Sequence, residues 1–164
     1  MRKFIGAGLV LLVAAIFMWA PVALAETPWF DMPNCAFCKN LTAEPGLMDH
    51  ITKWEHKNIS NGSMTITAVD LEYLSAFKRA MGNMEKTSEA LKQGQMLPMC
   101  GMCQAFGMLM QQGAKYENVE SGNIFVGMMQ SDKPEVVAKI HEWTDRTNAE
   151  MKKMEEMPKG EKAD

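Results

Sequence analysis

Residues and motifs that commonly carry catalysis are scarce in this 164-residue chain. There is no G-x-S-x-G, no H-E-x-x-H and no glycine-rich phosphate loop, and no pair of acidic side chains suggests acid–base chemistry. Haem attachment requires C-x-x-C-H, but Lys39 and Gln104 follow the two C-x-x-C pairs of this chain. We therefore expect a binding protein and not an enzyme.

An excess of positive charge is also absent. Lys and Arg number 17 against 20 Asp and Glu, and no basic run occurs. A mildly acidic chain is a poor match for nucleic acid and has no electrostatic attraction to an anionic membrane. Neither partner is expected.

The only long apolar run lies at the N-terminus. Arg2 and Lys3 precede it, and the small residues Ala23 and Ala25 end it, which is the pattern of a cleavable signal peptide over residues 1–25. An uncleaved anchor is the alternative, but the run is short for a span of about 20 residues. Cleavage after Ala25 would leave a periplasmic or secreted protein with no stable membrane span.

Two later segments, residues 57–69 and 116–129, predict β-hairpins. Asn61-Gly62 and Ser121-Gly122 are the expected two-residue turns, because glycine there permits a positive φ. Apolar and polar residues alternate after each turn, as in half-buried strands. The apolar sets are Met64, Ile66 and Ala68 in the first hairpin and Ile124, Val126 and Met128 in the second. The two segments align without a gap at an offset of about 60 residues.

Each hairpin is preceded by a C-x-x-C with a helical stretch and followed by a longer helix. Asp70 is the expected cap of the first long helix, which extends to about Gly94. Asp132 and Glu135 resemble a capping box for the second, which runs to about Met157. Residues 47–54 are expected to add a helical piece to the first half.

This order of elements predicts an α+β fold built from a duplicated α-β-β-α unit. The two hairpins would form a four-stranded antiparallel sheet packed against helices. We expect one domain over residues 26–157, made of repeats at about 33–94 and 95–157, and a disordered tail at 158–164.

The four cysteines form two C-x-x-C motifs, Cys35/Cys38 and Cys100/Cys103. A proline lies two residues before each motif, at Pro33 and Pro98, so the sites look like copies. If the copies face each other, four sulfurs converge in the ligand set of a tetrahedral Zn²⁺ site. The main hypothesis is therefore an exported metal-binding or metal-handling protein that uses all four thiolates for Zn²⁺ or Cu(I).

Two alternatives remain open at this point. Export to an oxidising compartment favours disulfides, so each C-x-x-C could be a reversible redox pair of a cell-envelope protein. The cysteines could also be structural disulfides in a partner-binding domain, although a C-x-x-C disulfide closes too small a loop to stabilise much. The expected partners are a metal ion and, for the alternatives, another cell-envelope protein.

Methionine is unusually frequent, with 17 residues in the chain. Met99 and Met102 flank the second cysteine pair and are candidate auxiliary ligands, because thioethers suit Cu(I). Most other methionines lie on apolar stripes and are expected to fill the core. Among the three histidines, His50 is the only candidate for an additional ligand, together with its neighbour Asp49.

Overall fold

The computed structural model describes residues 27–156, so the predicted signal peptide, its cleavage site and the predicted tail lie outside the described residues. Four α-helices, two short 3-10 helices and four strands make up this part of the chain. In chain order they are α1 (Lys39–Thr42), η1 (Leu47–His50), β1 (Ile51–Ile59), β2 (Gly62–Val69), η2 (Leu71–Tyr73), α2 (Leu74–Lys92), α3 (Gly101–Gln111), β3 (Lys115–Ser121), β4 (Ile124–Gln130) and α4 (Pro134–Glu156). None of these helices is long and apolar enough to cross a membrane.

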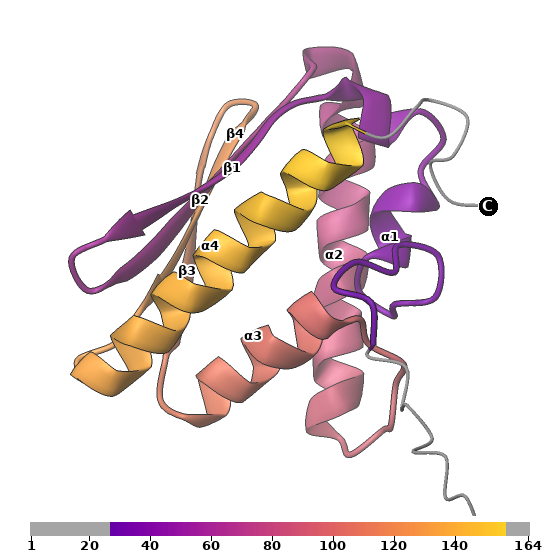
Figure 1. Cartoon of the computed structure of the whole chain (residues 1–164). Coiled ribbons are helices and arrows are strands. Elements are labelled where there is room, and N and C mark those ends of the chain that lie inside the picture. The colour runs from indigo at the N-terminus through magenta and orange to yellow at the C-terminus, as the bar shows by residue number, and fades with distance from the viewer. Residues whose placement is uncertain (1–26, 157–164) are drawn as a thin grey trace, which may run out of the picture.

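The strands form one antiparallel sheet in the order β1-β2-β4-β3. Each hairpin contributes an edge strand and a central strand, and the two hairpins join through β2 and β4. Figure 1 shows the long helices gathered on one side of this sheet. The predicted α+β class, with a four-stranded antiparallel sheet and helices, is confirmed.

The predicted turn positions are wrong by one residue in each hairpin, in opposite directions. Ile59 pairs with Gly62 and Ser121 pairs with Ile124, so the turn residues are 60–61 and 122–123. Gly122 has the expected positive φ of 62°. Gly62 instead lies in β2, where an added Cβ would be 1.9 Å from the carbonyl oxygen of Met129 on β4. Glycine at this position therefore permits close strand packing and not a turn.

These positions also change the spacing between the halves. The turns, at 60–61 and 122–123, are 62 residues apart, whereas the predicted offset is 60 residues. The helices after the two cysteine motifs differ as well, since α1 has 4 residues and α3 has 11. The structure does not establish the internal duplication, which stays a prediction.

The helix predicted over residues 47–54 is replaced by a single turn, η1, and the start of β1. Ile51 already pairs with Val69, and β-branched Ile51 and Thr52 favour the strand. Asp70, the predicted cap, makes no capping bond from its side chain and instead accepts a hydrogen bond from His50. The helix ends agree better with the sequence, because α2 stops at Lys92 before Gly94, whose φ is 84°.

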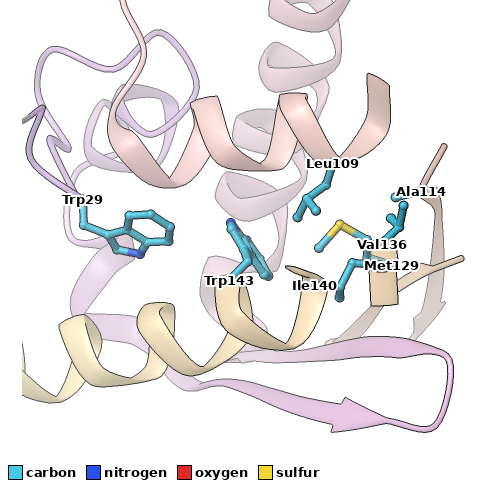
Figure 2. Close-up of a cluster of buried hydrophobic side chains, with 7 residues drawn as sticks. All are labelled: Trp29, Leu109, Ala114, Met129, Val136, Ile140 and Trp143. Carbon is cyan, nitrogen blue, oxygen red and sulfur yellow. The ribbon is translucent and has the colours of Figure 1, made fainter. Parts of the chain in front are cut away.

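Two apolar clusters hold the helices on the sheet. One lies between α3, α4 and β4, and Figure 2 shows its side chains: Trp29, Leu109, Ala114, Met129, Val136, Ile140 and Trp143. The other joins α1, η1 and α2 to the opposite end of the sheet through Leu41, Leu47, Val69, Phe77 and Ala80. The cysteine motifs belong to neither cluster and form a third one of their own.

The side chains of the sheet that face the helices include polar ones beside Val69, Phe125 and Met129. His56, Ser63 and Thr67 are buried there, and the ring of His56 meets the ring of Trp143 on α4 edge-on. Because successive side chains in a strand point to opposite faces, Met64 and Ile66 lie on the other side. The alternation expected from the sequence is therefore present. The apolar sets named from the sequence, Met64, Ile66 and Ala68 and Ile124, Val126 and Met128, point away from the helices.

Candidate metal centre

The two cysteine motifs occupy different local structures. Cys35 lies in the turn before α1, and Cys38 is the N-cap of that short helix. Cys100 is the N-cap of α3 with an extended backbone, and Cys103 lies in the first turn of that helix. Only Cys103 thus lies inside the first turn of a helix.

Backbone hydrogen bonds between distant segments bring the motifs together. The amide of Ala36 in the first motif donates to the carbonyl of Pro98, just before the second, at 2.8 Å. The amides of Gly101 and Met102, at the N-terminus of α3, donate to the carbonyls of Pro28 and Trp29. Helix N-terminal amides have no partner within their own helix, so the arm at residues 28–29 satisfies two of them.

The glycine of the second motif has a steric role. A Cβ on Gly101 would lie 3.3 Å from both the Pro28 carbonyl oxygen and the Trp29 ring. The Trp29 ring is in turn held by the guanidinium of Arg146, which stacks 4.1 Å from its centroid. The small residue in C-G-M-C therefore permits the arm to pack closely beside the cysteines.

The four sulfurs converge on one point. Cys38 Sγ lies 3.8 Å from Cys100 Sγ and 3.7 Å from Cys103 Sγ. All four Sγ atoms lie within 4.8 Å of one another. A tetrahedron with metal–sulfur bonds of ~2.3 Å has edges of ~3.8 Å. The cluster is therefore compatible with a metal site, and the predicted convergence of both motifs is found.

The environment of the sulfurs is mostly apolar. Cys35, Cys38 and Cys100 are only 1–3% exposed, whereas Cys103 is partly exposed. Met32, Phe37 and Met102 pack against them. Met102, a candidate auxiliary ligand, thus lies beside the cluster together with Met32. Met99 is not among the side chains packed there, and its backbone carbonyl accepts a hydrogen bond from Gln104.

The sulfurs differ in acidity within each motif. Hydrogen bonds from the thiols of Cys100, Cys103 and Cys38 hold the pKa of Cys35 far below its usual range. Hydrogen bonding from Cys103 lowers the pKa of Cys100 to about 6, and the backbone amide of Cys103 adds to this. The pKa values of Cys38 and Cys103 are raised, first because each donates to Cys100. The first cysteine of each pair is therefore more acidic than the second.

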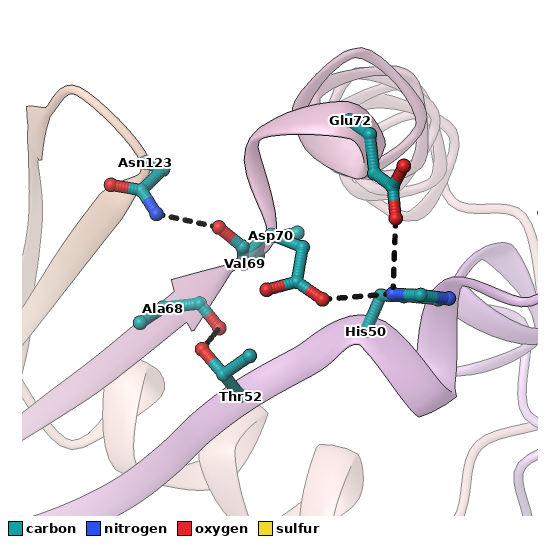
Figure 3. Close-up of polar contacts among 7 residues, drawn as sticks. All are labelled: His50, Thr52, Ala68, Val69, Asp70, Glu72 and Asn123. Atoms are coloured by element: carbon teal, nitrogen blue, oxygen red, sulfur yellow. Dashed lines mark hydrogen bonds and ion pairs between the residues drawn. The ribbon is translucent and has the colours of Figure 1, made fainter.

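A second group of candidate ligands lies at the start of β1. His50 Nδ1 lies 2.8 Å from a carboxylate oxygen of Asp70 and 3.7 Å from one of Glu72. Figure 3 shows both contacts as dashed lines. The imidazole also stacks on Tyr73 at 3.7 Å between ring centroids. Asp49, the predicted companion of His50, is not part of this group. The ion pair between His50 and Asp70 connects the start of β1 to the segment after β2, and this structural role is sufficient to explain it. In the sequence, only the pairing register of β1 with β2 could have indicated that these residues meet.

Comparison of the chain with known protein families, curated proteins and solved structures finds no match. A functional assignment must therefore rest on the geometry of the cysteine cluster.

Proposed function

We propose that this protein is an exported metal-binding protein that holds one metal ion on Cys35, Cys38, Cys100 and Cys103. The observation that carries the proposal is the separation of 3.7–3.8 Å between Cys38 Sγ and the two sulfurs of the other motif. This separation equals the edge of a tetrahedral tetrathiolate centre. Because all four sulfurs lie within 4.8 Å of one another, the space between them suits a single ion.

Zn²⁺ is the ion that the site fits best, with Cu(I) as the competing ion. Four thiolates around Zn²⁺ leave a net charge of −2, whereas the same set around Cu(I) leaves −3. Burying the larger charge costs more free energy, and three of the four sulfurs are buried. Soft ligands nevertheless suit Cu(I), and the thioethers of Met32 and Met102 pack beside the cluster.

The role that follows is metal binding and not metal-assisted catalysis. A catalytic zinc site keeps one position open for water or substrate, whereas four cysteines complete the coordination of a tetrahedral ion. The centre joins the N-terminal arm and α1 to the start of α3, so the ion would also stabilise this part of the fold. Export is included in the proposal because of the charge, apolar core and small terminal residues of segment 1–25.

The test is a joint count of metal and thiols. The protein is isolated from the producing cell without added metal, the bound metal is measured by mass spectrometry, and thiols are titrated before and after denaturation with a chelator. We expect about one zinc per chain and four thiols that react only after denaturation. Copper at the same stoichiometry would assign the site to Cu(I).

Two other outcomes would contradict metal binding. If no thiols appear until a strong reductant is added, the cysteines are structural disulfides. If metal is absent and the pairs are reduced easily, near the potentials of redox proteins, the redox alternative holds. Cys103→Ser should lower metal retention, whereas Met99→Leu is the matched control on the same segment and should retain the full amount.

A further inference from the structure

The face of the sheet away from the helices, here called the outer face, has an apolar centre. β2 contributes Met64, Ile66 and Ala68, and β4 contributes Ile124, Val126 and Met128. None of them belongs to the apolar clusters that hold the helices. Ile124 is 42% exposed, and the adjacent Val119 on β3 is 47% exposed. Apolar side chains thus occupy the open side of the sheet, while Ser63 and Thr67 face α4.

The packed face is apolar too, through Val69, Phe125 and Met129, so the sheet carries apolar side chains on both faces, which an isolated two-layer domain does not require. An antiparallel sheet with one solvated face normally places its apolar side chains on the packed face and polar ones outside. Large exposed apolar patches usually mark an interaction surface. Figure 1 shows α2, α3 and α4 on the same side of the sheet, so they leave the outer face open.

Charged side chains border the apolar centre on both edge strands. On β1 the outer residues are Lys53, Glu55 and Lys57, and on β3 they include Lys115 and Glu117. Strand register places Lys57 opposite Met64, Met64 opposite Met128, and Met128 opposite Glu117. One row across the sheet therefore begins with a positive charge, crosses two methionines and ends with a negative charge.

We propose that the outer face binds the outer face of a second copy of this chain. A two-fold axis parallel to the strands exchanges the β1 and β3 edges but keeps each row at its height. Lys57 of one copy then lies over Glu117 of the other, and the symmetry forms this pair twice. The four central methionines of the row lie between the two pairs. Lys53 and Lys57 both pair with Glu55 of their own chain. Lys53 begins a different row, through Ala68 and Ile124 to Ser121, and meets no charge of the second copy.

The size of the face determines how strong the association is. Four strands about 4.8 Å apart and seven residues long, with a rise of about 3.3 Å per residue, cover roughly 450 Å². Two copies would bury about 900 Å², which is below the size of standard stable interfaces and within the range of weak ones. We therefore expect a dimer that dissociates on dilution, with a dissociation constant on the order of micromolar.

Sedimentation equilibrium of the metal-loaded protein over a range of concentrations tests this directly. Lys57→Glu should weaken the dimer about tenfold, because it places like charges together twice. Combining Lys57→Glu with Glu117→Lys should restore the wild-type constant, since the pair is reversed but kept. Lys53→Glu is the matched control on the same strand and face, and Glu117→Lys should not rescue any effect that it has.

An apolar-centre variant makes the test independent of charge. Ile66→Lys should leave only monomer, with an unchanged circular dichroism spectrum and metal content, because the side chain already points to solvent in the single chain. A wild-type protein that is monomeric at about 100 µM would overturn the proposal. Equal effects of Lys57→Glu and Lys53→Glu, without rescue by Glu117→Lys, would overturn the two-fold arrangement. Neither result bears on metal binding, which the metal and thiol counts decide separately.

Discussion

Removing the metal should lower the free energy of unfolding substantially, because the proposed ion joins segments that are far apart in sequence. Cys38 and Cys100 are 62 positions apart. In the chain-entropy description, a cross-link that closes a loop of this length stabilises the fold by about 4 kcal/mol. Metal binding by cysteines of the unfolded chain would reduce this value. The loss is large compared with the 5–15 kcal/mol that is typical of a whole domain.

The assay is guanidinium unfolding with and without a strong chelator, in the presence of a reductant so that disulfides cannot replace the ion. We expect the chelator to lower the free energy of unfolding by ~3–4 kcal/mol and to shift the midpoint to a lower denaturant concentration. Cys38→Ser is the matched control, since a protein with a broken ligand set should be weaker initially and respond little to the chelator. A wild-type protein whose stability changes by less than about 1 kcal/mol would refute a bridging ion.

Three further predictions concern the scaffold. Burial lowers the pKa of His56 to about 4. The unfolded chain therefore binds a proton that the folded one does not once the pH falls below the unfolded pKa of about 6.5. The free energy of unfolding should decrease by up to roughly 3 kcal/mol between pH 6.5 and pH 4. Unfolding measured against pH should show this loss, and His56→Gln should remove it. Gly62→Ala should destabilise the protein by more than about 2 kcal/mol, since its Cβ would clash with the Met129 carbonyl. Gly107→Ala, in a helix with nothing within 4 Å of the added Cβ, should stabilise it by about 0.5–1 kcal/mol; equal effects of the two would contradict this reasoning. Ile140 is fully buried between α4 and the sheet. Ile140→Ala should lower the free energy of unfolding by about 3–4 kcal/mol, measured by thermal or chemical unfolding.

Local sequence signals were sufficient for the fold class and for the cysteine cluster. The alternation in residues 62–69 and 124–130 predicted strands, and the repeated proline and C-x-x-C pattern predicted that the motifs meet. The first turn was misplaced because a glycine after asparagine can mark either a turn or a close approach of another strand. At Gly62 the close approach of the Met129 carbonyl, which depends on the pairing of β2 with β4, is the one that applies.

The orientation of the sheet could not be predicted for a related reason. A period of two shows that a strand has two unlike faces, but it does not show which of them meets the helices. On the helix-facing side, the Thr65 hydroxyl and His56 Nδ1 form a hydrogen bond of 2.9 Å. Asn148 of α4 donates a hydrogen bond from its side-chain amide to the carbonyl of His56. Asn148 is 92 residues from His56 in the sequence, so this polar partner of the buried strand could not be read from the hairpin itself.

The position of the cysteines in the chain also sets an order of events during synthesis. Cys35 and Cys38 leave any channel first, and 61 more residues must follow before Cys100 arrives, because positions 38 and 100 differ by 62. During that interval only half of the proposed ligand set exists. The first hairpin and α2 lie within the interval, so they can form before the second motif arrives. The four-sulfur cluster is then completed late, so an ion bound by all four cysteines would report that most of the chain is in place.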